Sequence, residues 1–162
     1  LSLQPLPEET VEMFLVDHAG LSPDEARNIA GISGGRPGYA LHLAKGEGLE
    51  AAALADDFIA ALETRAGLHG FADKLAPKAA DTLWRSFRTI LLQKISQQAR
   101  RLASHETVAD TSHLATASPA TLVRVWEELK RLIETGDALN TDRGQLVLAM
   151  GIRSRAILKE AA

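Results

Sequence analysis

The sequence lacks cysteine altogether and is poor in aromatic residues. None of its 162 residues is Cys, and Phe, Trp and Tyr together make up 4%. The absence of Cys excludes disulfides, thiol catalysis and Cys-ligated zinc, and it is typical of proteins in a reducing compartment. No stretch approaches the ~18 apolar residues of a membrane-spanning helix, and no basic-then-apolar signal segment opens the chain. We therefore expect a cytoplasmic protein that does not contact a membrane.

The charges leave no large excess of either sign. The chain has 18 Lys and Arg against 21 Asp and Glu, a formal net charge of −3, and 46% of its residues are apolar. This composition is typical of a globular protein and excludes wholesale disorder, while the weak negative charge gives no overall attraction to nucleic acid. Because the chain begins at Leu1 and not at Met, we expect it to be part of a longer protein.

Motifs of nucleotide and hydrolase chemistry are also missing. The sequence has no Gly-x-x-x-x-Gly-Lys-Ser/Thr loop, no Gly-x-Ser-x-Gly turn and no His-Glu-x-x-His pair. His105, Glu106 and His113 fall in an expected loop, where solvated side chains are a better interpretation than a metal site. The adjacent carboxylates at 56–57 and 127–128 point about 100° apart on a helix and do not converge on one reacting atom. We expect no catalytic residue, no cofactor and no metal in this chain.

Apolar residues recur every three or four positions along nearly the whole chain, and this periodicity predicts an all-α fold. The clearest helix start is at Ser22, which can cap a helix, with Pro23 at the first helical position and Glu25 three residues after the cap. We expect helices over residues 7–18, 23–32, 37–44, 49–63, 68–75 and 77–104, and two more that begin after Ser118 and after the turn at 140–142.

A glycine-rich link divides the expected helices into two units. Residues 1–46 hold three short helices, which are few for an independent core, and residues 49–162 hold about five helices around one core. The stretch Gly46-Glu47-Gly48 is the best candidate for the boundary. The sequence leaves open whether the first unit packs on the second or swings on this link.

One expected helix is strongly basic, because Asp81 is its single acidic residue. Its six basic residues are Lys78, Arg85, Arg88, Lys94, Arg100 and Arg101. Such a stripe can be a solvated face, a surface for an acidic protein or a contact for phosphates, and all three interpretations stay open. Trp84 and Trp126 lie on apolar stripes, where core packing is the first interpretation and a subunit-interface anchor the second. The candidate interface or basic-face residues are Trp126, Arg85, Arg88 and Lys94.

The stretch from Ile32 to Leu41 combines a helix stop, a glycine-rich turn and a new helix whose first N–H groups are free. It resembles the second-sensor segment of the clamp-loader family of AAA+ ATPases. The resemblance is closest to the delta-prime subunits of bacterial DNA polymerase III clamp loaders, which read Gly-Ser-Pro-Gly before Ala-Leu. The residues that match are Gly35, Pro37, Gly38, Ala40 and Leu41, and Arg36 replaces the Ser.

Two further stretches agree with this resemblance, in the order that the family has them. Residues 3–9, Leu-Gln-Pro-Leu-Pro-Glu-Glu, are similar to the Pro-rich segment that leads into the family's lid domain. Residues 137–143, Asp-Ala-Leu-Asn-Thr-Asp-Arg, are similar to the Asn-containing turn before the last helix of its collar domain. Together the three stretches span nearly the whole chain.

The resemblance implies a non-hydrolysing clamp-loader subunit without its ATPase core, with a three-helix lid over residues 1–46 and a collar over residues 49–162. Its partners would be the delta and gamma/tau subunits in a hetero-oligomer and, through that assembly, the sliding clamp and primed DNA. It also implies a degenerate second-sensor turn, Gly35-Arg36-Pro37-Gly38. Gly38 stands where hydrolysing relatives carry an Arg that contacts nucleotide phosphates.

Two other functions stay open. The chain could be the lid region of another AAA+ ATPase that responds to nucleotide through Arg36, or a helical module that binds nucleic acid through the basic stripe. Nucleotide binding only after the chain is rejoined to an upstream domain would mark the first. Salt-dependent DNA binding that is lost when Arg85 and Arg88 are replaced would mark the second.

Overall fold

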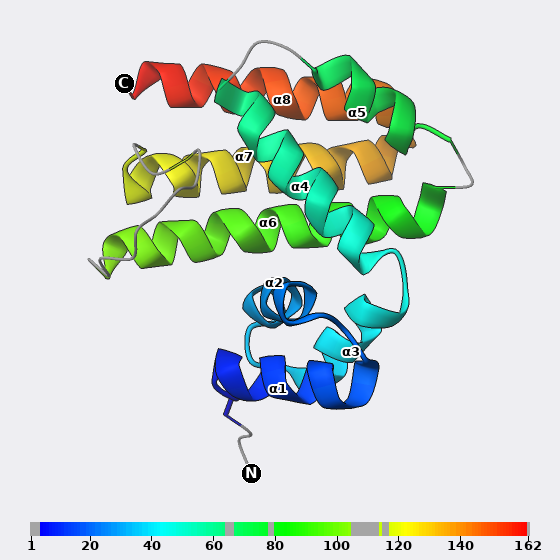
Figure 1. Ribbon diagram of the computed structural model, residues 1–162. Coiled ribbons are helices and arrows are strands. Elements are labelled where there is room, and N and C mark those ends of the chain that lie inside the picture. The colour runs from blue at the N-terminus through cyan, green and yellow to red at the C-terminus, as the bar shows by residue number, and fades with distance from the viewer. Residues whose placement is uncertain (1–3, 64–66, 78–79, 105–113, 115–116, 162) are drawn as a thin grey trace.

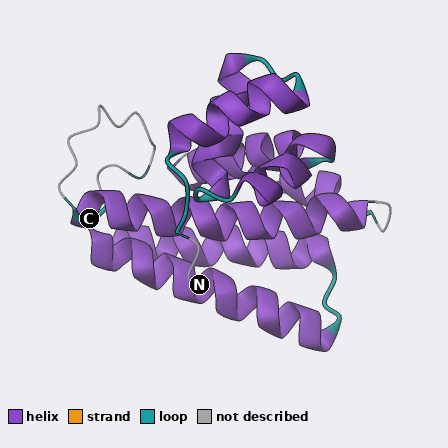
Figure 2. Cartoon of the chain, turned by 90° about the horizontal axis from the view of Figure 1, so that it is seen from below, coloured by secondary structure: helices purple, strands orange, loops and turns teal. Residues whose placement is uncertain are grey.

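The computed structural model describes residues 4–63, 67–77, 80–104, 114 and 117–161. These residues form eight helices and no strand, so the predicted all-α fold is confirmed for the described part of the chain. In Figure 2 the coloured segments are helices joined by loops.

The first three helices are α1 (Glu8–Ala19), α2 (Pro23–Ser33) and α3 (Pro37–Lys45). Each of them contacts the other two, and they form the lower part of the molecule in Figure 1. Their common core includes Val11 and Leu15 of α1 and Ile29 of α2, all fully buried. The predicted ends of these helices agree with the structure within one residue, because each helix begins or ends at a local signal. Pro7, however, is the N-cap of α1 and not its first residue.

The other five helices are α4 (Gly48–Glu63), α5 (Leu68–Leu75), α6 (Asp81–Ala103), α7 (Pro119–Leu139) and α8 (Arg143–Glu160). Helices α6, α7 and α8 lie side by side, α4 crosses them, and α5 packs on α8 (Figure 1). Arg155 of α8 donates from Nε to the Ala61 carbonyl of α4 at 3.2 Å. The last helix therefore closes the five-helix part against its first helix.

The long basic helix is shorter than the sequence predicts. The prediction begins it at Pro77, whereas α6 begins at Asp81 with Ala80 as its N-cap. The Ala80 N–H donates to the Pro77 carbonyl at 2.9 Å, and Ala80 has ψ +24°, outside the α-helical region. The helix therefore begins four residues later than the sequence predicts. Lys78, a member of the predicted basic stripe, lies outside the described residues.

Aromatic rings join the helices of the five-helix part. Phe58 of α4 meets Phe71 of α5 and Phe87 of α6 edge to face, with ring centroids 5.8 Å apart in both pairs. Trp84 stacks on Phe87 and is 3% exposed, so its predicted core role is confirmed. Such ring pairs contribute roughly 0.5–1.5 kcal/mol each beyond the burial of their area. These four rings tie α4, α5 and α6 into one core.

The connection between α3 and α4 is short and closely packed. Gly46 and Glu47 separate the two helices, and Gly48, the first residue of α4, is buried. A Cβ on Gly48 would lie 2.2 Å from the Leu43 carbonyl oxygen, so the two backbones approach as closely as glycine alone permits. Elsewhere, Gln97 Nε2 of α6 donates to the Gly31 carbonyl of α2 at 2.6 Å. The link that the sequence suggests as a boundary is thus a tight turn, and α2 contacts α6 while α3 contacts α4.

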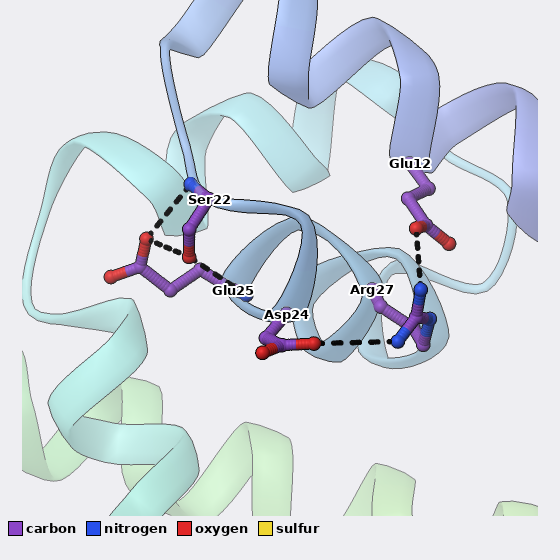
Figure 3. A network of polar contacts seen from close by, with 5 residues as sticks. All are labelled: Glu12, Ser22, Asp24, Glu25 and Arg27. Carbon is purple, nitrogen blue, oxygen red and sulfur yellow. Dashed lines mark hydrogen bonds and ion pairs between the residues drawn. The ribbon is translucent and has the colours of Figure 1, made fainter.

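The start of α2 forms the capping box that the sequence predicts (Figure 3). The Glu25 N–H donates to Ser22 Oγ at 3.4 Å, and the Ser22 N–H donates to Glu25 Oε2 at 3.0 Å. The hydrogen bonds from Ser22 hold the pKa of Glu25 below its ordinary value of 4.5. Beside the box, Arg27 pairs with Glu12 at 3.2 Å and joins α2 to α1.

We predict that Ser22→Ala lowers the free energy of unfolding by about 1 kcal/mol at neutral pH, the usual cost of losing an N-cap side chain. A carboxylate whose pKa is lowered in the folded state stabilises that state above its unfolded pKa, and this effect is lost as the pH falls through the folded pKa. The difference between wild type and variant should therefore shrink below pH 4.5. Urea unfolding at neutral pH and at acidic pH measures it.

The matched control is Ser118→Ala. Ser118 caps α7 by accepting from the Thr121 N–H, and Thr121 stands where α2 has Glu25. Because Thr121 does not titrate, the cost of Ser118→Ala should be the same at both pH values. An equal pH dependence of the two variants would contradict the role assigned to Glu25.

Candidate functional site

The glycine-rich turn between α2 and α3 packs on the segment before α1. The Leu6 N–H donates to the Gly35 carbonyl at 2.9 Å. Gly35 has φ +74°, and a Cβ there would lie 2.4 Å from the Leu6 carbonyl oxygen and 2.6 Å from Pro5 Cβ. Glycine alone fits both the left-handed backbone and this approach. The structure thus brings together parts of two of the three stretches that carry the family resemblance.

Arg36 is engaged within its own turn. Its Nε donates to the Ser33 carbonyl at 3.0 Å, and its guanidinium lies 5.0 Å from the centre of the Tyr39 ring. Burial raises the pKa of Tyr39, against the opposing effect of the Arg36 charge. Pro37 begins α3, and the exposed Gly38 follows it. The Arg36 cation therefore binds a carbonyl at the end of α2.

Acidic side chains form ion pairs with four basic residues of α6. The ion pairs are Arg85–Asp81, Arg88–Asp137, Lys94–Asp56 and Arg101–Glu8. The Lys94–Asp56 pair, at 2.8 Å, is the most enclosed of them on the lysine side, because the Lys94 side chain is 17% exposed. Three of these pairs join α6 to other helices and the Arg85–Asp81 pair lies within α6, so the stripe is divided into separate ion pairs. This division weakens its interpretation as a continuous contact for nucleic-acid phosphates, which needs cations that are free to replace counterions.

The adjacent carboxylates on α4 and α7 do not form acid–base pairs. Arg131 makes two hydrogen bonds to the carboxylate of Glu128, at 2.8 and 2.7 Å, and these lower the pKa of Glu128. Its neighbour Glu127 is exposed, as is Asp57 beside the paired Asp56. Within the described ranges no group of three or more His, Asp or Glu could hold a metal ion. His105, Glu106 and His113 lie outside the described residues.

An open groove lies between α6 and α7, with a volume of 440 Å³. Its lining is mostly apolar and consists of Ser96, Ala99, Arg100, Ala103, Pro119, Ala120, Val123 and Trp126. Val123 is 46% exposed, Trp126 is half-buried, and Lys130 Nζ lies 5.3 Å from the centre of the Trp126 ring. Arg100 makes no ion pair with another described residue. An exposed apolar patch that is edged by charged groups is typical of a protein-binding surface.

The two tryptophans have different surroundings although their sequence patterns are alike. Trp84 is in the core, whereas Trp126, the candidate anchor, lies at the groove. Val123 is not among the candidate interface residues that the sequence indicates. It stands three residues before Trp126 and shares its side of α7, and this spacing is the signal that could have identified it.

Comparisons of the chain with protein-family models, with curated proteins and with solved structures each give no match. None of the described helices combines the length and the apolar character that a bilayer span requires. A functional proposal for this chain is therefore carried by the groove and by the residue patterns of the sequence.

Proposed function

We propose that the chain is the C-terminal part of a delta-prime subunit of a DNA polymerase III clamp loader, and that it assembles with other subunits without chemistry of its own. The open groove at Val123 and Trp126 is the observation that supports this most. Apolar area left in water costs roughly 25 cal/mol per Å², so a subunit gains stability when a neighbour covers such a groove. In this proposal α1–α3 are the lid and α4–α8 are the collar.

The partners in this proposal are the delta and gamma/tau subunits, and the sliding clamp and primed DNA are reached through their assembly. Two contacts favour it over the alternatives. Arg36 is bonded to Ser33 and lies over Tyr39, which disfavours a nucleotide sensor. The ion pairs along α6 disfavour a module that binds nucleic acid through this helix.

Light scattering after gel filtration tests the proposal, with the chain alone and mixed with the collar regions of delta and gamma/tau subunits of the same organism. We expect a defined hetero-oligomer that contains one copy of this chain. Val123→Asp should weaken its assembly by ~100-fold or more, because an unpaired charge buried in an interface is strongly unfavourable.

The matched control is Ile152→Asp, which makes the same change at an apolar residue of α8 that is 61% exposed and outside the groove. It should leave the assembly intact. Thermal unfolding of both variants checks that neither has lost its fold. A monomer in every mixture, or equal effects of the two variants, would contradict the proposal.

A further inference from the structure

Besides the apolar groove, the surface has a polar cavity where the start of α6 meets the turn between α7 and α8, which we call the notch. Its volume is 350 Å³. Three arginines and two carboxylates line it: Arg85, Arg88, Arg143, Asp81 and Asp137. Buried Trp84 and Leu146 also line it, together with Asn140 and Thr141, which are exposed. None of these residues lines the apolar groove, so the notch is a separate feature of the surface.

The arginines of the notch outnumber its carboxylates. Asp81 serves two of them: its Oδ2 lies 2.9 Å from Arg85 Nη2, and its Oδ1 accepts from Arg143 Nη2. Asp137 accepts from Arg88 Nη1. Three guanidinium groups therefore share two carboxylate groups, and the notch carries one net positive charge although the whole chain is negative.

Two of these arginines are held in place by the fold. The side chains of Arg88 and Arg143 are 27% and 25% exposed, and Arg143 Nη1 also donates to the Pro77 carbonyl at 3.4 Å. Groups that are already ordered lose little side-chain entropy when a ligand binds. Among the described residues Arg88 donates through Nη1, which leaves the N–H groups of its Nη2 and Nε for a ligand. Arg85, which is 70% exposed, can turn toward the same ligand.

We propose that this notch binds a phosphate group. A phosphate carries more negative charge than a carboxylate and has three acceptor oxygens, so it can accept from Arg85, Arg88 and Arg143 at once, and guanidinium forks suit its geometry. A carboxylate is the poorer fit, because its two oxygens would only repeat what Asp81 already does. The Asn140 amide and the Thr141 hydroxyl can add neutral donors at the rim. The ligand is a free phosphate or diphosphate, because the ion pairs along α6 disfavour a nucleic-acid backbone on this helix.

Isothermal titration calorimetry of the full 162-residue chain tests this, with orthophosphate, pyrophosphate and a short DNA duplex as probes at constant ionic strength. Arg88→Gln should weaken binding at least ~10-fold, since it removes the best-held donor. Asp137→Asn should strengthen binding several-fold, because it removes the carboxylate that competes for Arg88. A residue with a merely structural role would not give this gain.

The matched control is Lys94→Gln, which removes one positive charge from the same helix at the Asp56 pair, outside the notch. It should leave the affinity within about twofold of wild type, and thermal unfolding checks that each variant is folded. Binding of orthophosphate or pyrophosphate that follows this pattern supports a free phosphate as the ligand. Binding of the duplex alone with the same pattern would overturn the proposal and support a nucleic-acid contact through α6. No binding of any probe, or equal losses in Arg88→Gln and Lys94→Gln, would overturn the proposal.

Discussion

Replacing Phe58 by Ala should lower the free energy of unfolding by about 3–5 kcal/mol, the range for truncating a buried aromatic side chain. Phe58 is fully buried and meets both Phe71 and Phe87 edge to face. Its removal leaves a cavity between three helices, which cannot close without moving α4. Urea unfolding followed by circular dichroism measures the loss.

The matched control is Phe14→Ala. Phe14 is half-buried on α1, where its ring stacks on His18 with centroids 4.7 Å apart. Its truncation leaves a depression at the surface and not an enclosed cavity, so it should cost clearly less. Phe58→Leu keeps most of the side-chain volume and should lose less stability. It can therefore be measured if Phe58→Ala does not fold. A loss at Phe58 no larger than the loss at Phe14 would contradict the role of the ring cluster.

Gly48→Ala should destabilise the protein by about 3 kcal/mol, the upper part of the range for forcing an extra carbon into a packed site. The added Cβ would lie 2.2, 2.7 and 2.8 Å from three backbone atoms of Leu43. Backbone atoms cannot rotate away as the tip of a side chain can, so α3 has to move relative to α4. Thermal unfolding measures the loss, and hydrogen exchange should quicken more in α1–α3 than in α4–α8.

Gly46→Ala is the control at the same junction. The nearest atom to a Cβ on Gly46 is the His42 carbonyl oxygen, at 3.8 Å, which is an ordinary contact. Gly46 also has a negative φ of −126°, so Ala should change the stability by less than about 0.5 kcal/mol. If the two alanine variants unfold at the same temperature, the close approach at Gly48 is not a constraint on the fold.

Helix ends could be predicted well because they depend on neighbouring residues. Ser22 and Ser118 cap α2 and α7 as their Ser-Pro patterns indicate, and Asp142, in the predicted turn, caps α8. The start of α6 could not be placed in this way. Pro77 suits a first helical turn, but the ψ of Ala80 is not helical, and α6 begins only after it, at Asp81.

The surfaces could not be derived from the sequence to the same degree. Periodicity shows which residues share one side of a helix, but not which helix lies opposite. Arg88 and Asp137 are 49 positions apart, so their pairing appears only when α6 and α7 are packed. For the same reason the sequence could not distinguish the buried Trp84 from Trp126, whose side of α7 is left open.

The packing of α8 on α4 has a consequence for the order of folding. The bond between Arg155 and Ala61 joins residues 94 positions apart, whereas α6 and α7 are consecutive helices. Closing a long loop costs more entropy, and folding slows as contacts become more distant along the chain. The α6–α7 and α7–α8 pairs, each of consecutive helices, should therefore form early, and α8 should dock on α4 and α5 late. Until it docks, apolar side chains such as Leu68 of α5, which contacts α8 at Gly151, remain in water and are open to aggregation.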